Sequence, residues 1–134
     1  MVEIVVFPDI ESLVETYLSA QLADRGDNTP IARTAPADPP ARLIRLTSFW
    51  GEDTGRALAS RFVTVQCTDA TSADAADLAE LCFAILRGAR HDPSMPSVRD
   101  VVAVDRPSDR LPEPDPYRPN YQFTLSFLVR GQAR

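Results

Sequence analysis

His91 is the only histidine of the chain, and it is the first candidate for acid–base chemistry because imidazole titrates near neutral pH. It follows Arg90 and precedes an Asp-Pro pair at the expected end of a helix. This position predicts an exposed residue that interacts with the helix C-terminus, rather than a general base. The two cysteines, Cys67 and Cys82, lie in apolar patterns and are predicted to be buried free thiols.

Metal ions are normally held by several histidine, cysteine or clustered carboxylate side chains, and one histidine with two apolar cysteines does not supply such a set. Asp69, Asp74 and Asp77 cluster near an expected helix start, but carboxylates also stabilise helix N-termini, and we prefer that interpretation. Five scattered glycines form no phosphate-binding loop, and there is no Gly-x-Ser-x-Gly nucleophile motif. The sequence therefore predicts no catalytic residues, no metal and no cofactor, and the protein is not expected to be an enzyme.

The remaining candidates are residues suited to protein interfaces, whose centres are enriched in aromatic and arginine side chains. The predicted interface residues are Val5, Phe7, Trp50, Arg56, Tyr117 and Arg118. They come from an apolar N-terminal segment, from a charged loop and from the end of a proline-rich arm. The alternatives left open are that Trp50 packs in the core, that Tyr117 lies on its own domain, and that the N-terminal segment pairs with its own sheet.

Size and charge limit the class of protein. A chain of 134 residues with 44% hydrophobic residues is large enough for one domain with one core. The net charge of −5 gives no basic field for phosphate backbones, which disfavours nucleic-acid binding as the main activity. The segment Met1–Phe7 is interrupted by Glu3 and is not followed by a signal-peptide pattern, and no window reaches the length of a membrane span. We therefore expect a cytosolic protein, with no membrane partner.

The strongest secondary-structure signal is the segment Tyr117–Gly131, where apolar and polar residues alternate. Such alternation is typical of a strand with one buried face. The apolar face is expected to contain Tyr121, Phe123, Leu125, Phe127 and Val129. A strand of this kind must belong to a sheet that other elements cover on that face.

Two segments have the apolar spacing of amphipathic helices. The first is predicted at about residues 10–25, with Asp9 as its N-cap and Gly26 after its last turn. The second has Thr71 or Ser72 as its N-cap and ends at Gly88. Each helix has one apolar stripe, so both are expected to cover the same face of the sheet.

Further strands are predicted on both sides of the second helix. The candidates are a short edge strand at Ile31–Thr34, then Arg42–Trp50, Arg61–Thr68 and Ser97–Asp105. Apolar residues occur on both faces of Arg42–Trp50, so we expect this strand to be covered on each side. In the last candidate, Val98, Val102 and Val104 are expected to share a face, with Val101 opposed to them.

Two connections complete the chain. Gly51–Ser60 is predicted to be a hairpin loop, which is long because such loops usually have about two to five residues. Arg106–Pro119 is rich in proline and is expected to be an extended excursion over the surface. The predicted fold class is α+β, a two-layer sandwich with a mainly antiparallel sheet of four to five strands and two helices on one face. It forms a single domain over residues 1–134.

Three segments resemble tail terminator proteins of long-tailed, siphovirus-type phages that infect actinobacteria. They are residues 7–18 (FPDIESLVETYL), residues 42–46 (RLIRL) after a proline-rich loop, and the close of the chain from Pro114 through YQFTL to VRG at 129–131. The chain departs from the family pattern at Phe49–Glu52, where a Gly-rich turn is usual. It departs again at Cys67–Asp69, where an aromatic residue often follows the third strand.

The resemblance implies a structural virion protein. Such proteins form a ring, expected to be a hexamer, that caps the tail tube, ends its polymerisation and joins the tail to the head connector. The implied partners are other copies of the chain, the tail tube protein and the head–tail connector protein, and genomic DNA passes through the lumen without sequence-specific binding. The implied location is the tail or neck of the virion, after a period in the host cytoplasm. The resemblance also places the loop around Trp50–Arg56 toward the tube or the lumen.

Two other functions fit the sequence. The first is another neck, head–tail connector or minor tail protein, which would share the size and the α+β class. The second is a small host ligand-binding domain or enzyme, which would need a closed apolar pocket with convergent polar groups.

Overall fold

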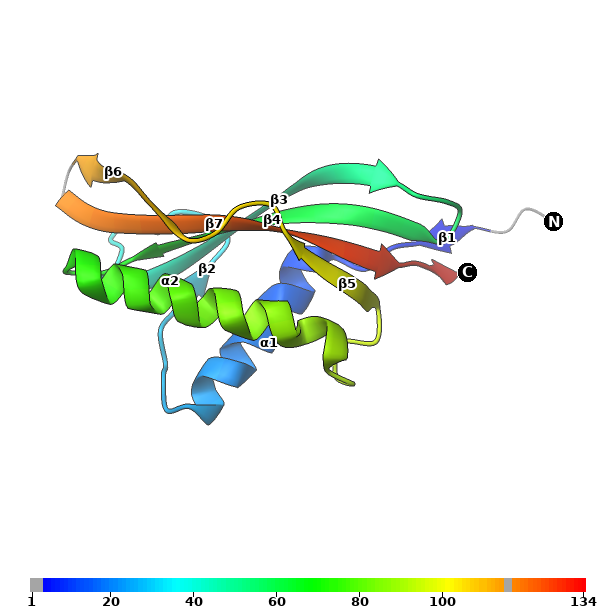
Figure 1. Ribbon diagram of the computed structural model, residues 1–134, viewed down its shortest axis with the longest axis horizontal. Helices are drawn as coiled ribbons and strands as arrows, with labels where there is room; N and C mark the ends of the chain where they lie inside the picture. Colours follow the sequence, from blue (N-terminus) through cyan, green and yellow to red (C-terminus); the bar gives the residue numbers. More distant parts are fainter. Residues whose placement is uncertain (1–3, 115–116) are drawn as a thin grey trace.

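The computed structural model describes residues 4–114 and 117–134, with side chains over residues 4–110 and 118–134. The protein folds as an α+β sandwich, in which both helices lie on one side of a sheet (Figure 1). In chain order the elements are β1 (Val5–Val6), α1 (Ile10–Asp24), β2 (Ile31–Ala32), β3 (Leu43–Asp53), β4 (Leu58–Thr68), α2 (Ser72–Arg87), the 3₁₀ helix η1 (Gly88–His91), β5 (Val98–Ala103), β6 (Ser108–Pro114), β7 (Tyr117–Arg130) and β8 (Gln132–Ala133).

The main sheet has six strands in the order β2-β3-β4-β7-β5, with β6 also paired to β7. Only the short β2 runs parallel to its neighbour, and the other pairings are antiparallel. The predicted class is confirmed, but the sheet is larger than the four to five strands expected. A separate two-stranded sheet joins β1 to β8.

The additional strand, β6, lies where a surface excursion was predicted at Arg106–Pro119, so that prediction was wrong. β6 pairs with the first part of β7, from Ser108 opposite Gln122 to Pro114 opposite Tyr117. Proline cannot donate to a ladder, but it is tolerated on an edge strand whose outer side has no neighbour. The proline content therefore marks an edge strand rather than a loop.

The prediction of which side chains share a face in Ser97–Asp105 was also wrong. Val98 and Val101 are buried, whereas Val102 and Val104 are 54% and 56% exposed. A register shift between Val98 and Asp100 inserts one residue and reverses the alternation. Alternation alone cannot locate such a bulge.

The hairpin between β3 and β4 is tighter than the predicted Gly51–Ser60 loop, because both strands continue into it and leave a turn at residues 54–57. A bulge lies between Trp50 and Asp53. At Gly51 a Cβ atom would collide with the Oγ and carbonyl group of Ser60, so this position requires glycine.

β3 is covered on one face only over most of its length, contrary to the prediction of cover on each side. Ile44 and Leu46 are fully buried against the helices. On the opposite face Phe49 is 49% exposed, and it stacks on Phe62 of β4 with ring centres 5.1 Å apart. The sheet therefore has a covered face and an open face.

The helices begin at the predicted residues. The Asp9 carboxylate accepts hydrogen bonds from the backbone of Glu11 and Ser12 at the start of α1, and the Thr71 hydroxyl accepts one from Asp74 N at the start of α2. Gly26 follows α1 with a φ of 74°, a conformation that favours glycine. In the described part of the chain, no helix is long and apolar enough to cross a membrane.

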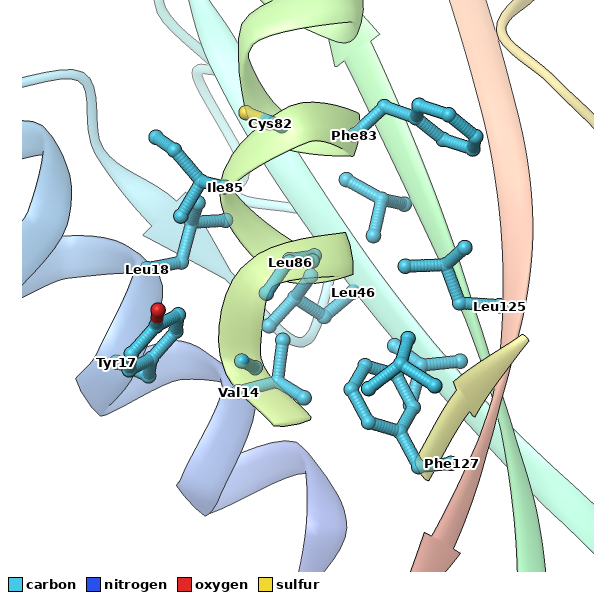
Figure 2. Packing of buried hydrophobic residues seen from close by; sticks show 14 of the residues in the cluster. Val14, Tyr17, Leu18, Leu46, Cys82, Phe83, Ile85, Leu86, Leu125 and Phe127 are labelled. Carbon is cyan, nitrogen blue, oxygen red and sulfur yellow. The ribbon is translucent and has the colours of Figure 1, made fainter. Parts of the chain in front are cut away.

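The core fills the space between the helices and the covered face of the sheet (Figure 2). Figure 2 shows Tyr17 and Leu18 of α1 beside Ile85 of α2, and Phe83 of α2 directed toward β7. Phe83 meets Phe123 edge to face, with ring centres 5.3 Å apart. Cys67 and Cys82 are free and buried, as predicted.

A polar cluster fixes the loops at one end of the sheet. The Arg42 guanidinium donates to the carboxylates of Asp27 and Asp69, at 2.8 and 2.7 Å, and to the Thr29 hydroxyl at 2.7 Å. Asp69 and Thr29 are each only 8% exposed. The cluster joins the loop after α1, the start of β3 and the end of β4.

Candidate functional site

A cation–aromatic stack stands at the hairpin end of the main sheet. The Arg61 guanidinium carbon lies 4.6 Å from the Trp50 ring centre and 5.2 Å from the Phe7 ring centre. Trp50 is 76% exposed, which excludes the alternative that it packs in the core. We call Phe7, Trp50 and Arg61 the hairpin surface.

The bulge in β3 positions this surface. Glu52 N donates to the Ser60 hydroxyl at 2.9 Å, which holds the two strands together where the ladder is interrupted. Arg61 follows directly, with its side chain 15% exposed and 3.7 Å from the Asp53 carboxylate. The arginine thus contacts a carboxylate and two rings, one of which is the exposed ring of Trp50.

The N-terminal segment contributes Phe7. Val5 pairs with Ala133 in the β1–β8 sheet, and Arg134 N donates to the Ile4 carbonyl at 2.7 Å. A Cβ atom on Gly131 would meet Val5 Cγ1 and the Phe7 ring, so the segment packs closely on the end of β7. Over its described residues, the segment pairs with its own chain.

A shallow cleft of about 230 Å³ adjoins Trp50 and runs to the start of α1. Its lining includes Ser48, whose hydroxyl donates to the Glu11 carboxylate at 2.6 Å, and Asp9. Burial raises the pKa of Asp9, but hydrogen bonds from Ser12 and the charge of Arg33 outweigh this and leave that pKa below its ordinary value. The cleft thus offers one carboxylate, that of Asp9, beside an exposed aromatic ring.

A second cleft, of about 520 Å³, lies between the start of β5 and the C-terminus and is lined by Arg99 and Arg130. Neither arginine has an ion pair within residues 4–110 and 118–134. These side chains can meet an anionic group from outside the chain.

The structure does not bring all the predicted interface residues together. Val5, Phe7 and Trp50 gather at the hairpin end, and Arg56 is exposed in the adjoining turn. Arg118 lies at the other end of the long axis, near the start of β7 (Figure 1). There its guanidinium donates to the carbonyls of Pro39 and Pro40 at 2.6 and 3.1 Å. The side chain of Tyr117 lies outside the described residues.

Arg61 is the residue that the sequence analysis missed. It was read only as the first residue of a strand, yet it is in phase with Val63, Val65 and Cys67, which face the core. A charged residue on the apolar phase of a strand was the available signal.

His91 is exposed and accepts a hydrogen bond from Arg90 Nε at 2.9 Å, and the described residues contain no group that could hold a metal ion.

Arg61→Gln is expected to release Trp50 from its stacked position, because it removes the cation that contacts the Trp50 and Phe7 rings. The free energy of unfolding should fall only slightly, by about 0.5–2 kcal/mol. Trp50 is the only tryptophan, so acrylamide quenching of fluorescence measures this directly and should increase. Arg87→Gln is the matched control, since Arg87 lies over Phe83, 5.6 Å from its centre, and should leave the quenching unchanged. Equal quenching in Arg61→Gln and the native protein would contradict the stack.

Comparison with known proteins does not supply a family for this chain. No family model matches it, and no curated protein matches it either.

Proposed function

We propose that this protein is a phage tail terminator, a structural virion protein that forms a ring, caps the tail tube and joins the tail to the head connector. The order and spacing of the three segments that resemble this family suggest the proposal. The observation that carries it is the hairpin end of β3 and β4, which extends beyond α2 (Figure 1) and presents Trp50 at 76% exposure. An exposed aromatic residue is a typical anchor for a protein partner.

The physical requirements of a closed ring also support the proposal. A closed ring needs two different complementary surfaces on each copy, and a rigid sandwich with an exposed hairpin at one end can offer them. The net charge of −5 suits a conduit through which DNA must pass without adhering.

Mixing the purified protein with tail tubes of the same phage tests the proposal. We expect ring-shaped caps at one tube end in electron micrographs, and tubes that no longer elongate when tube protein is added. Trp50→Ala should weaken capping at least tenfold because it removes the anchor. Asp38→Ala, an exposed change in the loop before β3, should cap normally.

Two results would contradict the proposal. Tubes that elongate freely at saturating protein would exclude a terminator. Binding to the head–tail connector without binding to tubes would indicate another neck protein.

A further inference from the structure

Among the described residues, the large apolar side chains that are exposed lie in the N-terminal segment and on the two outer edges of the main sheet. They are Ile4, Val6, Phe49, Trp50, Val102 and Val104. Two of them lie on β3, and two lie on β5 or just after it. Outer strands usually carry charges or proline that prevent pairing with other chains, so apolar residues at both edges are notable.

The outer edge of β3 has unused backbone groups. Ile44 N donates outward to the Pro30 carbonyl at 3.0 Å, and strand alternation then turns the N–H and C=O of Ser48 and Trp50 outward as well. β2 ends at Ala32, opposite Arg45. Beyond that point, β3 has no outer neighbour within the described part of the chain.

The outer edge of β5 is also without a neighbouring strand, although one of its outward N–H groups is occupied. Val104 N donates inward to the Thr124 carbonyl at 3.0 Å, so Val101 and Ala103 direct their backbone groups outward. The Val101 N–H already donates to the Asp100 carboxylate at 2.9 Å, whereas no such contact occupies the outward groups of Ala103 among the described residues. No described strand lies outside β5. β6 continues this edge, but Pro112 and Pro114 lack the N–H groups that a further strand would need.

Strand polarity makes the two edges compatible. Successive antiparallel pairings from β3 through β4 and β7 to β5 mean that β3 and β5 run in opposite directions. A second copy placed alongside in the same orientation therefore brings its β5 antiparallel to β3, which is the pairing that a hairpin-type ladder requires. The contact joins two different surfaces, as a ring demands.

We propose that the open edge of β3 in one copy pairs with the open edge of β5 in the next copy. Ser48 lies opposite Ala103, and Trp50 lies opposite Val101, so that outward backbone groups meet. In the second pair the Val101 N–H exchanges its bond to the Asp100 carboxylate for one to the Trp50 carbonyl. Phe49 then faces Val102, and Thr47 faces Val104, on the open side of the sheet.

The side chains disfavour one of the two neighbouring registers. A shift of two residues in one direction sets Phe49 against Asp100, which already pairs with Arg90 at 3.1 Å, and leaves Val104 opposite Arg45. The proposed register instead sets the exposed ring of Phe49 against the exposed side chain of Val102. The inference specifies how neighbouring copies would contact each other in the proposed ring. It rests on the proposed function for the number of copies in that ring.

Disulfide trapping tests the register. Thr47→Cys and Val104→Cys are made in separate molecules, because this pair has backbone groups that face away from each other and a Cα separation of about 4.5–5.5 Å, within disulfide range. An oxidised mixture should give a covalent dimer that neither variant gives alone. Thr47→Cys mixed with Val102→Cys is the control for register and should give little dimer. Cys67 and Cys82 are buried and should not react.

A backbone variant tests the hydrogen bonds. Ser48→Pro removes an N–H that points away from β4 and should abolish self-association, and Ser48→Ala, which also loses the hydroxyl contact to Glu11 but keeps the N–H, should retain it. Circular dichroism checks that each variant is folded. If Ser48→Pro does not fold, the cysteine pair decides alone.

The outcomes separate this inference from the proposed function. Capped tubes without the Thr47–Val104 disulfide, or capping retained by folded Ser48→Pro, would overturn the edge pairing and leave the terminator proposal standing. The disulfide in a protein that does not cap tubes would support the pairing and overturn the terminator proposal. Absence of both would overturn both.

Discussion

Phe123→Ala is expected to lower the free energy of unfolding by about 3–5 kcal/mol, because it replaces a large side chain in the middle of the core. Phe123 is fully buried and lies at the centre of β7, where its ring meets Phe83. No exposed neighbour can move in without disturbing both α2 and the sheet, so a cavity would remain.

Urea unfolding followed by circular dichroism measures this loss. Phe49→Ala is the matched control, because the same atoms are removed from a ring that is 49% exposed, and it should cost about 1 kcal/mol or less. A loss below about 1 kcal/mol in Phe123→Ala would mean that the core is not packed around this ring.

Arg42→Met is expected to be the second most damaging change, at about 2–3 kcal/mol, because it leaves two carboxylates without their cation while the aliphatic stem is kept. The Asp69 side chain is 12% exposed and that of Asp27 is 19%, although Arg42 itself is 39% exposed and partly screened by water. The control is Arg33→Met, which also removes two ion pairs, to Asp9 and Glu15, but on exposed groups. We expect a cost below about 1 kcal/mol there. Equal losses in the two variants would exclude a special role for the Arg42 cluster.

The same cluster should make stability depend on acid pH. Burial raises the pKa of Asp27, but hydrogen bonds from Thr29 and Arg42 outweigh this and hold that pKa below its ordinary value of 3.8. A lowered pKa means that the contribution is complete above the unfolded value and is lost as pH falls through the folded value. The free energy of unfolding should therefore fall below about pH 4, and Arg42→Met should flatten that fall. Parallel curves for the two proteins would contradict the assignment to Asp27.

The sequence was sufficient for elements whose signal is local. Asp9 and Gly26 bound α1 as predicted, since a cap and a left-handed residue are both written in the residue types. The covered faces of β4 and β7 also followed from alternation, because each strand is long and continuous in register where they pair.

The features that could not be predicted are set by contacts distant in sequence. The bulges in β3 and β5 depend on the partner strand, and each changes which side chains face outward. The open face of β3 arises because both helices cover the same side, which the composition of β3 does not reveal. The same holds for the candidate site, since Arg61 joins Trp50 to Phe7 only after the N-terminal segment pairs with β8.

The pairing of β7 on both sides affects how the molecule bears a pulling force. Its 14 residues are bonded to β4 on one side and to β5 and β6, in line, on the other. Hydrogen bonds between antiparallel strands lie perpendicular to the strand axis, so a pulling force along β7 loads many of them together in shear. The strand can therefore carry tension along the length of the molecule, because its hydrogen bonds would have to break together and not one at a time.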